Sequence, residues 1–192
     1  IKEFRIGFAE KDEKSMNEFF KKNNLTKTDI NNLGLLSERG NFLFKNRIIF
    51  PITNLRNETV GFGGRALDDF GPKYINTAES SIYRKNRSLY FTSEFLSDLK
   101  KKKFVILVEG YFDVIAFNKL GFNNVASPSG TALTVQQINL LSRYTKDIYL
   151  CFDNDEAGDT ATKRVLEIKN NQPSEINFFK INLPKEFKDI SE

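Results

Sequence analysis

The feature that most constrains the fold is an alternation of short apolar runs and helix-forming stretches that begins at Phe104. The run from Phe104 to Val108 is FVILV, which is typical of a strand buried on both faces of a sheet. The pattern predicts strands at 104–108, 124–126, 148–152 and 176–180, and helices at 111–119, from 135 onward and at 156–169. Strands and helices that alternate in this way predict a parallel sheet with helices on its faces.

A capping-box spacing supports one of these helices. Thr134 and Gln137 stand three positions apart at the expected start of the helix from Val135. In such a pair each side chain satisfies the other residue's backbone N–H, so a helix is expected to begin there.

The first half of the chain has a different pattern. Polar helical stretches at 14–22 and 28–33 precede two apolar segments, 42–52 and 58–65, which flank a turn-rich stretch. These segments predict a β-hairpin, with Pro51 near a sheet edge. The glycines at 61, 63 and 64 allow the backbone to approach another group closely. We expect an α/β protein with a mixed α+β lobe over residues 1–103 and a parallel-sheet lobe over residues 104–192.

The charge differs between the two expected lobes. Residues 1–103 carry 20 Lys plus Arg against 13 Asp plus Glu, a net +7, and residues 104–192 carry 9 against 12, a net −3. A basic lobe beside an acidic one suggests a phosphate-rich partner held by the first and a cation held by the second. The alternative is that these charged residues form ordinary solvated surface and bind no partner. The boundary itself, Lys100 to Lys103, is either a linker or the basic end of a helix.

Several classes of protein are excluded by composition. One cysteine and no histidine exclude an internal disulfide and a Cys-rich zinc site, so a bound metal is expected to be a hard cation with oxygen ligands. No apolar run is long enough to cross a bilayer, so no membrane partner is expected. The chain begins at Ile1 without a signal segment, which suggests a piece of a longer cytoplasmic protein.

Three carboxylates follow the expected strands. Glu109 comes after the first strand of the second lobe, and Asp153 and Asp155 come after the third. Ligand sites gather at the carboxyl ends of parallel strands, and residues two apart in an extended segment project to the same side. Carboxylates that converge in this way repel one another unless a divalent ion such as Mg²⁺ or Mn²⁺ neutralises them. The pattern therefore predicts metal-assisted phosphoryl transfer.

Two other interpretations of the acidic segment are open. Asp153 to Gly158 is also the composition of an ordinary acidic turn that caps the next helix. An EF-hand loop is disfavoured, because no acidic residue stands at its closing position.

The ordered motifs resemble a known family. Glu109-Gly110-Tyr111-Phe112-Asp113-Val114, followed by Asp153-Asn154-Asp155-Glu156-Ala157-Gly158, resembles the Toprim domain of primases, topoisomerases and several nucleases. Upstream, the segments 47–52, 61–65, 73–76 and 81–90 are similar to the basic region of bacterial DnaG-type primases, and 130–134 resembles the same family within the Toprim lobe. The resemblance covers nearly the whole chain and implies a Rossmann-like second lobe.

The resemblance implies a function and a set of site residues. The function is synthesis of short RNA primers from ribonucleoside triphosphates on single-stranded DNA, with one or two Mg²⁺ or Mn²⁺ ions. It also implies the RNA primer as a partner and, through a separate domain, the replicative helicase. The implied catalytic residues are Glu109, Asp113, Asp153 and Asp155, and the implied metal ligands are Glu109, Asp153 and Asp155, with Asp189 as a further candidate. The implied nucleotide- and template-binding residues are Lys45, Arg47, Arg65, Lys73, Tyr74, Asn76 and Lys85. Arginine suits bidentate phosphate binding, and Tyr74 suits stacking on a base.

The chain departs from the family pattern near its end. Asp189-Ile190-Ser191 stands where the family usually has Asp-Pro-Asp, which leaves the number of metal sites open. Lys45 stands where many relatives have arginine, and Asn86 stands where many have glycine. The rival functions are a Toprim nuclease or topoisomerase, and a non-catalytic module that binds single-stranded DNA or guanine nucleotides.

Overall fold

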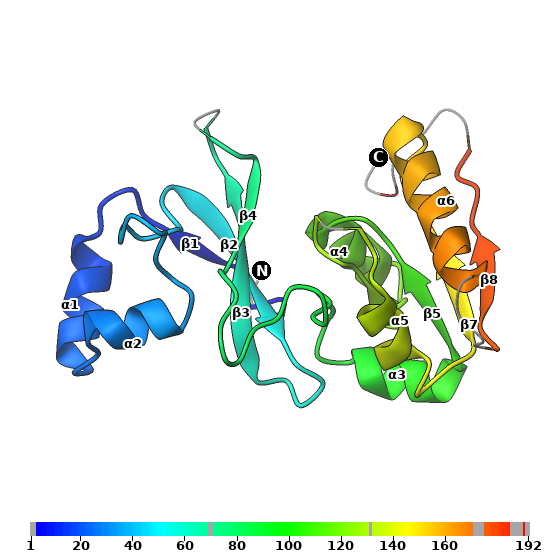
Figure 1. The fold of residues 1–192 in the computed structure, drawn as a ribbon, viewed down its shortest axis with the longest axis horizontal. Coiled ribbons are helices and arrows are strands. Elements are labelled where there is room, and N and C mark those ends of the chain that lie inside the picture. Colours follow the sequence, from blue (N-terminus) through cyan, green and yellow to red (C-terminus); the bar gives the residue numbers. More distant parts are fainter. Residues whose placement is uncertain (1–2, 69–70, 131, 171–174, 185–189, 191–192) are drawn as a thin grey trace. The chain divides into compact units, whose positions relative to one another are not determined.

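The computed structural model describes residues 3–68, 71–130, 132–170, 175–184 and 190. The chain forms two compact units, residues 1–85 and 86–192. Each unit contains one four-stranded sheet (Figure 1). No helix in the described part of the chain is long and apolar enough to cross a membrane.

The first unit is an antiparallel sheet with two helices. The order along the chain is β1 (Gly7–Ala9), α1 (Lys14–Lys22), α2 (Lys27–Asn32), β2 (Arg47–Thr53), β3 (Thr59–Ala66) and β4 (Tyr74–Asn76). The strands lie in the order β1-β2-β3-β4. The predicted hairpin is the β2–β3 pair, and β1 pairs only with Arg47 to Ile49. Within the described residues, Pro51 therefore has a strand neighbour on one side alone, as suits a residue without an N–H donor.

Two of the glycines in β3 make room for aromatic rings. A Cβ atom at Gly61 would lie within 3.0 Å of the Tyr83 ring, and one at Gly64 within 3.0 Å of the Phe44 ring. The glycines thus let aromatic side chains pack directly on the sheet backbone.

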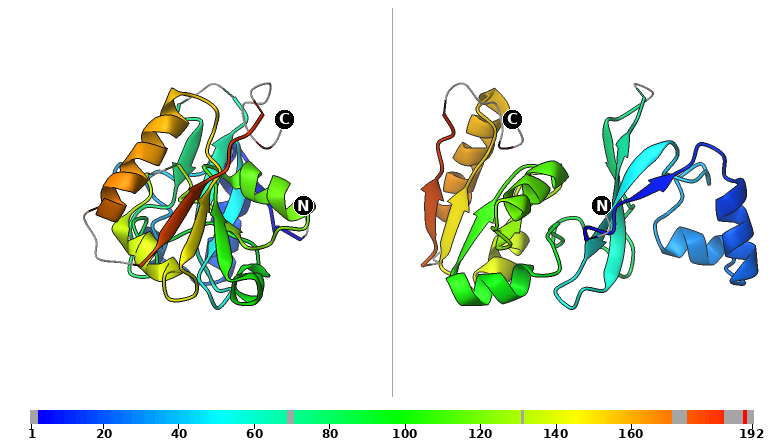
Figure 2. Two further views of the ribbon diagram at one scale, coloured as in Figure 1. Left: turned by 90° about the vertical axis from the view of Figure 1, so that its right-hand side faces the viewer. Right: turned by 180° about the vertical axis from the view of Figure 1, so that it is seen from behind.

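The second unit is the predicted parallel α/β lobe. Its elements are α3 (Phe95–Lys102), β5 (Phe104–Leu107), α4 (Tyr111–Lys119), β6 (Val125–Ala126), α5 (Val135–Leu141), β7 (Asp147–Leu150), α6 (Glu156–Asn170) and β8 (Asn177–Lys180). All four strands are parallel, in the order β6-β5-β7-β8. Figure 2 shows α5 and α6 on one face of the sheet and α4 on the other, as right-handed crossovers require.

The core of this unit lies on the sheet. Val105, Leu107, Ile148 and Leu150 are all at most 2% exposed. They alternate with Phe104, Ile106 and Tyr149, which point to the opposite face. The predicted capping box of α5 is present: Gln137 N donates to Thr134 Oγ1 over 3.2 Å, and Thr134 N donates to Gln137 Oε1 over 3.0 Å.

The second compact unit begins earlier than the predicted lobe. Tyr90 and Ser127 exchange two backbone hydrogen bonds, which ties the segment before α3 to this unit. Lys100, Lys101 and Lys102 form the last turn of α3, and Lys103 caps it with a φ of 61°. The lysine run is therefore the basic end of a helix, where positive charge offsets the helix dipole, and the linker interpretation is wrong.

Candidate active site at the strand ends of β5 and β7

The structure brings Glu109 and Asp153 together. Strands β5 and β7 are adjacent and parallel, with Leu107 opposite Leu150, so the residues after them lie at the same sheet edge. The backbone N–H of Asp153 donates to Glu109 Oε1 over 3.0 Å. Ser127 fixes the other side of Glu109, because its hydroxyl donates to the Glu109 carbonyl over 2.6 Å.

Asp113 lies beside the same site. Its Oδ2 accepts a hydrogen bond from Gly110 N over 2.8 Å, which closes the first turn of α4. Burial, together with smaller contributions from the charges of Asp113 and Asp153, raises the pKa of the neighbouring Cys151 thiol to about 11. The thiol is thus near both carboxylates. Cys151 is 4% exposed and packs as a small buried apolar residue.

Asp155 is tied to the start of α6. Its Oδ1 accepts from Gly158 N over 3.0 Å, so it caps the helix as the acidic-turn interpretation expected. Gly158 itself is packed tightly, since a Cβ atom there would lie within 3.0 Å of the Asp153 carbonyl oxygen. The Asp153–Asp155 turn and the first turn of α6 therefore form one closely packed piece.

The donor set fits a hard cation in its chemistry. Glu109 and Asp153 offer carboxylate oxygens at adjoining strand ends, which is the ligand type that Mg²⁺ and Mn²⁺ prefer. Among the described residues, however, no three Asp, Glu, Cys or His side chains are grouped closely enough to form a ligand set. Asp189 lies outside the described residues.

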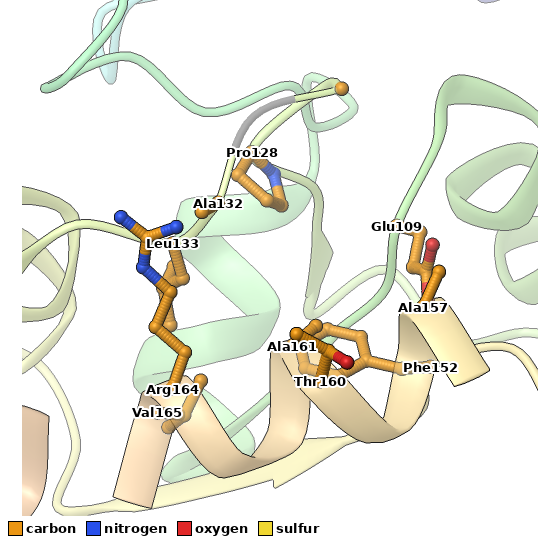
Figure 3. Close-up of a pocket in the computed structure, with 11 residues that line it drawn as sticks. Glu109, Pro128, Ala132, Leu133, Phe152, Ala157, Thr160, Ala161, Arg164 and Val165 are labelled. Carbon is orange, nitrogen blue, oxygen red and sulfur yellow. The ribbon is translucent and has the colours of Figure 1, made fainter. Parts of the chain in front are cut away.

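A pocket of about 280 Å³ opens beside Glu109 (Figure 3). Its walls are the first turns of α6 and the segment before α5. The lining is mostly apolar, with Glu109, Thr160 and Arg164 as its polar side chains: Glu109, Pro128, Gly130, Ala132, Leu133, Phe152, Ala157, Thr160, Ala161, Arg164 and Val165. Sequence analysis did not identify Thr160 or Arg164, although their spacing from Ala157 along α6 places all three on one helix face.

Three predicted binding residues share one face of the sheet in the first unit. Arg65 is directly opposite Tyr74, and Asn76 is opposite Gly63, so the three side chains project from the same face. The Arg65 guanidinium carbon lies 5.9 Å from the centre of the Tyr74 ring, and Tyr74 is 38% exposed. A cation beside an accessible aromatic ring is an arrangement that can bind a phosphate and stack on a base of the same nucleic acid strand.

Arg47 is placed differently. Its partner in the pairing is Ala66, so it projects from the opposite face of the sheet to Arg65. It is only 6% exposed, and its guanidinium donates to the carbonyls of Gly64 (3.2 Å) and Lys73 (3.4 Å). Burial lowers the pKa of Arg47, an effect opposed by the charge of Asp68. These two hydrogen bonds join Arg47 of β2 to β3 and to the residue just before β4.

The predicted lysines lie outside the sheet. Lys45 forms an ion pair with Glu13 and, with Arg47, lines a pocket of about 680 Å³ in the first unit. Lys73 is exposed just before β4, and the backbone N–H of Lys85 donates to Glu79 Oε1 over 2.8 Å. The structure thus gathers Arg65, Tyr74 and Asn76 on one surface and leaves the lysines dispersed.

Comparison with known proteins matches both halves of the chain. Residues 1–96 match the model of the DNA primase catalytic core, N-terminal domain, and residues 106–192 match the Toprim-like model. The chain belongs to the DNA primase family. The resemblance drawn from the sequence motifs and the Toprim-type parallel lobe are confirmed.

Individual DNA primases are similar over most of the chain. The chain is 40% identical to the DNA primase of Rickettsia bellii over 172 residues, which is 88% of the chain and 28% of that protein. It is 35% identical to that of Clostridium acetobutylicum over 184 residues, 94% of the chain and 31% of that protein. The chain therefore spans less than a third of the length of these relatives.

Solved primase structures have the same fold. The zinc-binding and RNA polymerase domains of Aquifex aeolicus primase match with a TM-score of 0.87 and 34% identity, over 98% of the chain and 47% of that structure. A DnaG primase catalytic domain bound to single-stranded DNA matches with a TM-score of 0.83 and 31% identity, over the whole chain and 61% of that structure.

Proposed function

We propose that this chain is the catalytic core of a primase, which joins ribonucleotides into short RNA primers on a single-stranded DNA template. The hydrogen bond from Asp153 N to Glu109 Oε1 carries the proposal, because it joins two family-motif carboxylates at adjacent strand ends. The match to a primase domain bound to single-stranded DNA supports DNA as the template.

The proposed reaction is nucleotidyl transfer. A 3′-hydroxyl attacks the α-phosphate of a ribonucleoside triphosphate, a P–O bond forms, and pyrophosphate leaves. Glu109 and Asp153 would hold the Mg²⁺ or Mn²⁺, with Asp155 and Asp189 as further proposed ligands. A bound ion of this kind lowers the pKa of the attacking hydroxyl and offsets negative charge on the phosphate.

The residues of the chain itself position the reactants in this proposal. Ser127 and the Asp153 backbone fix Glu109 from both sides, and Asp113 holds the start of α4 beside it. Residues 1–103 would hold the template, with Arg65 on a phosphate and Tyr74 on a base, while residues 104–192 carry the chemistry. Lys45, Arg47, Lys73, Asn76 and Lys85 remain predicted contacts. The helicase contact and the cytoplasmic location also remain predictions.

One incubation separates this proposal from its rivals. The 192-residue chain is mixed with a single-stranded DNA template, labelled ribonucleotides and Mn²⁺ or Mg²⁺, and the products are resolved by length. Labelled short RNA supports a primase. Shortened DNA indicates a nuclease, and DNA binding without any product indicates a non-catalytic module. Supercoiled plasmid included in the same incubation would be relaxed by a topoisomerase.

Two isosteric variants test the carboxylates. Glu109→Gln keeps an oxygen that accepts from Asp153 N, so the turn is preserved while the charge is lost. Asp153→Asn likewise removes a charge from a side chain of the same shape, and its backbone N–H remains the donor to Glu109. Since disturbing even the outer partners of a metal site costs roughly 10–100-fold, we expect each variant to lose about 100-fold or more in primer synthesis.

The control for these variants is Glu167→Gln, which removes an exposed carboxylate on α6. It should synthesise primers like the wild type. Circular dichroism should show all three variants folded. A Glu109→Gln or Asp153→Asn chain with wild-type synthesis would contradict the assignment.

A further inference from the structure

A second pocket of the Toprim unit, which is the second compact unit of residues 86–192, lies on an exposed face of α5. Its volume is about 430 Å³. Gln136, Asn139 and Leu140 share one face of the helix, and Arg143 follows just after its last residue. Arg87, from the segment before α3, completes the lining. The proposed reaction uses none of these residues.

The backbone on both sides of Arg87 is tied to the start of α5. The Thr134 hydroxyl donates to the Asn86 carbonyl over 2.6 Å, and the Gln137 side-chain amide donates to the Ser88 carbonyl over 2.7 Å. Gln137 is fully buried. The capping box of α5 therefore also fixes the position of Arg87 beside the helix. A cation whose backbone is held in this way needs little reorganisation to bind a ligand.

The pocket has the chemistry of an anion site. Two guanidinium groups and two carboxamides line it, and none of the described lining residues is acidic. Within the described part of the chain, neither Arg87 nor Arg143 forms a salt bridge. Guanidinium groups bind phosphate oxygens in a bidentate manner, and carboxamide N–H groups donate to the same acceptors.

We propose that the pocket formed by Arg87, Gln136, Asn139, Leu140 and Arg143 binds a backbone phosphate of a nucleic acid strand. This contact extends the proposed primase function and rests on it, because only a primase would make the bound strand its template or primer. It adds a fixed phosphate contact on the Toprim unit to the contacts proposed for Arg65 and Tyr74.

The salt dependence of binding measures this contact. Binding of a fluorescent single-stranded oligonucleotide to the 192-residue chain is followed by anisotropy at increasing NaCl. Each lost phosphate contact should reduce the slope of log K against log salt by about 0.7. We therefore expect the slope to drop by about 0.7 for the Arg87→Gln, Arg143→Gln double variant, which removes the one proposed contact, and by no more than that for either single variant.

Three controls isolate the pocket. Lys119→Gln removes an exposed charge at the end of α4 and should keep the wild-type slope. The Arg87→Lys, Arg143→Lys double variant keeps both charges and should retain most of the slope. Thermal unfolding should be unchanged in all of them, because both arginines are exposed.

Competition identifies the source of the phosphate. ATP and inorganic phosphate are titrated against the bound oligonucleotide. A double Gln variant that loses ATP binding yet keeps the oligonucleotide slope would show a site for free nucleotides and overturn the proposal. An unchanged slope with unchanged ATP binding would overturn it as well.

Primer synthesis is measured in parallel so that the two proposals can fail separately. A reduced slope in a chain that makes no primers supports the pocket and rejects the primase proposal. Primer synthesis with an unchanged slope in the double Gln variant supports the primase proposal and rejects the pocket.

Discussion

Single side chains at the strand ends serve both structure and the proposed chemistry. Glu109, Asp113 and Asp155 each accept a hydrogen bond from a backbone N–H: those of Asp153, Gly110 and Gly158. A carboxylate that accepts such a bond is held in one orientation. The proposed site is thus oriented by the backbone of β5, β7 and the helices that follow them.

Gly158 is the residue whose size matters most to this arrangement. A Cβ atom there would lie within 3.0 Å of the Asp153 carbonyl oxygen, which is backbone and cannot rotate away. We expect Gly158→Ala to cost about 1–3 kcal/mol of stability through overpacking and to displace Asp153, which reduces primer synthesis. Denaturant unfolding and the primer assay measure the two effects.

Gly7→Ala is the matched control for this substitution. A Cβ atom at Gly7 would meet nothing within 4 Å, and its backbone needs no positive φ. It should leave unfolding and synthesis close to the wild type. A Gly158→Ala chain as stable and active as the Gly7→Ala chain would show that the turn has room to adjust.

At the scale of elements, α5 depends on a buried amide. The Gln137 side chain accepts from Thr134 N and donates to the Ser88 carbonyl, and it is fully buried. Gln137→Ala leaves both groups without that partner, so we expect it to cost about 1–3 kcal/mol. Gln136→Ala, at the exposed neighbouring position, should cost less than about 0.5 kcal/mol. Equal unfolding midpoints for the two variants would contradict this role.

The face of β3 and β4 that carries Arg65 and Tyr74 gives a second prediction at this scale. Stacking on a base contributes about 1–3 kcal/mol and depends little on salt, whereas a phosphate contact contributes to the salt slope. Tyr74→Ala should therefore weaken oligonucleotide binding roughly tenfold at every salt concentration. Arg65→Gln should reduce the salt slope by about 0.7.

Lys21→Gln, on α1, serves as the control for that face, because it removes an exposed charge elsewhere in the same unit. Anisotropy titrations at several salt concentrations separate the two effects. If Tyr74→Ala changed only the slope, the ring would have no stacking role.

At the scale of the whole molecule, we expect the fold to be independent of the metal. Each unit has its own sheet, and the Glu109 and Asp155 carboxylates are held by backbone hydrogen bonds. EDTA should therefore abolish primer synthesis, and excess Mg²⁺ should restore it, while the far-UV circular dichroism stays the same. Loss of the dichroism signal on chelation, as in small zinc domains, would show that the metal is structural.

The sequence by itself determined helices α1 and α2, the β2–β3 hairpin, the alternating elements from β5 to β8, the capping box at Thr134 and the placement of Glu109 and Asp153 after parallel strands, but not β1 or β4. These features follow from local periodicity and from the rule that parallel strands end at one edge. The motifs around them also determined the family, which the comparisons confirm.

Only the tertiary structure decided which side chains are accessible and how segments join. Arg47 and Arg65 are both arginines on strands, yet strand pairing places them on opposite faces and buries the first. The segment of Arg87 joins the Toprim unit through hydrogen bonds to Thr134 and Gln137, residues far away in the sequence. Periodicity along a chain reports local conformation, whereas exposure and long-range hydrogen bonds depend on register and packing between distant segments.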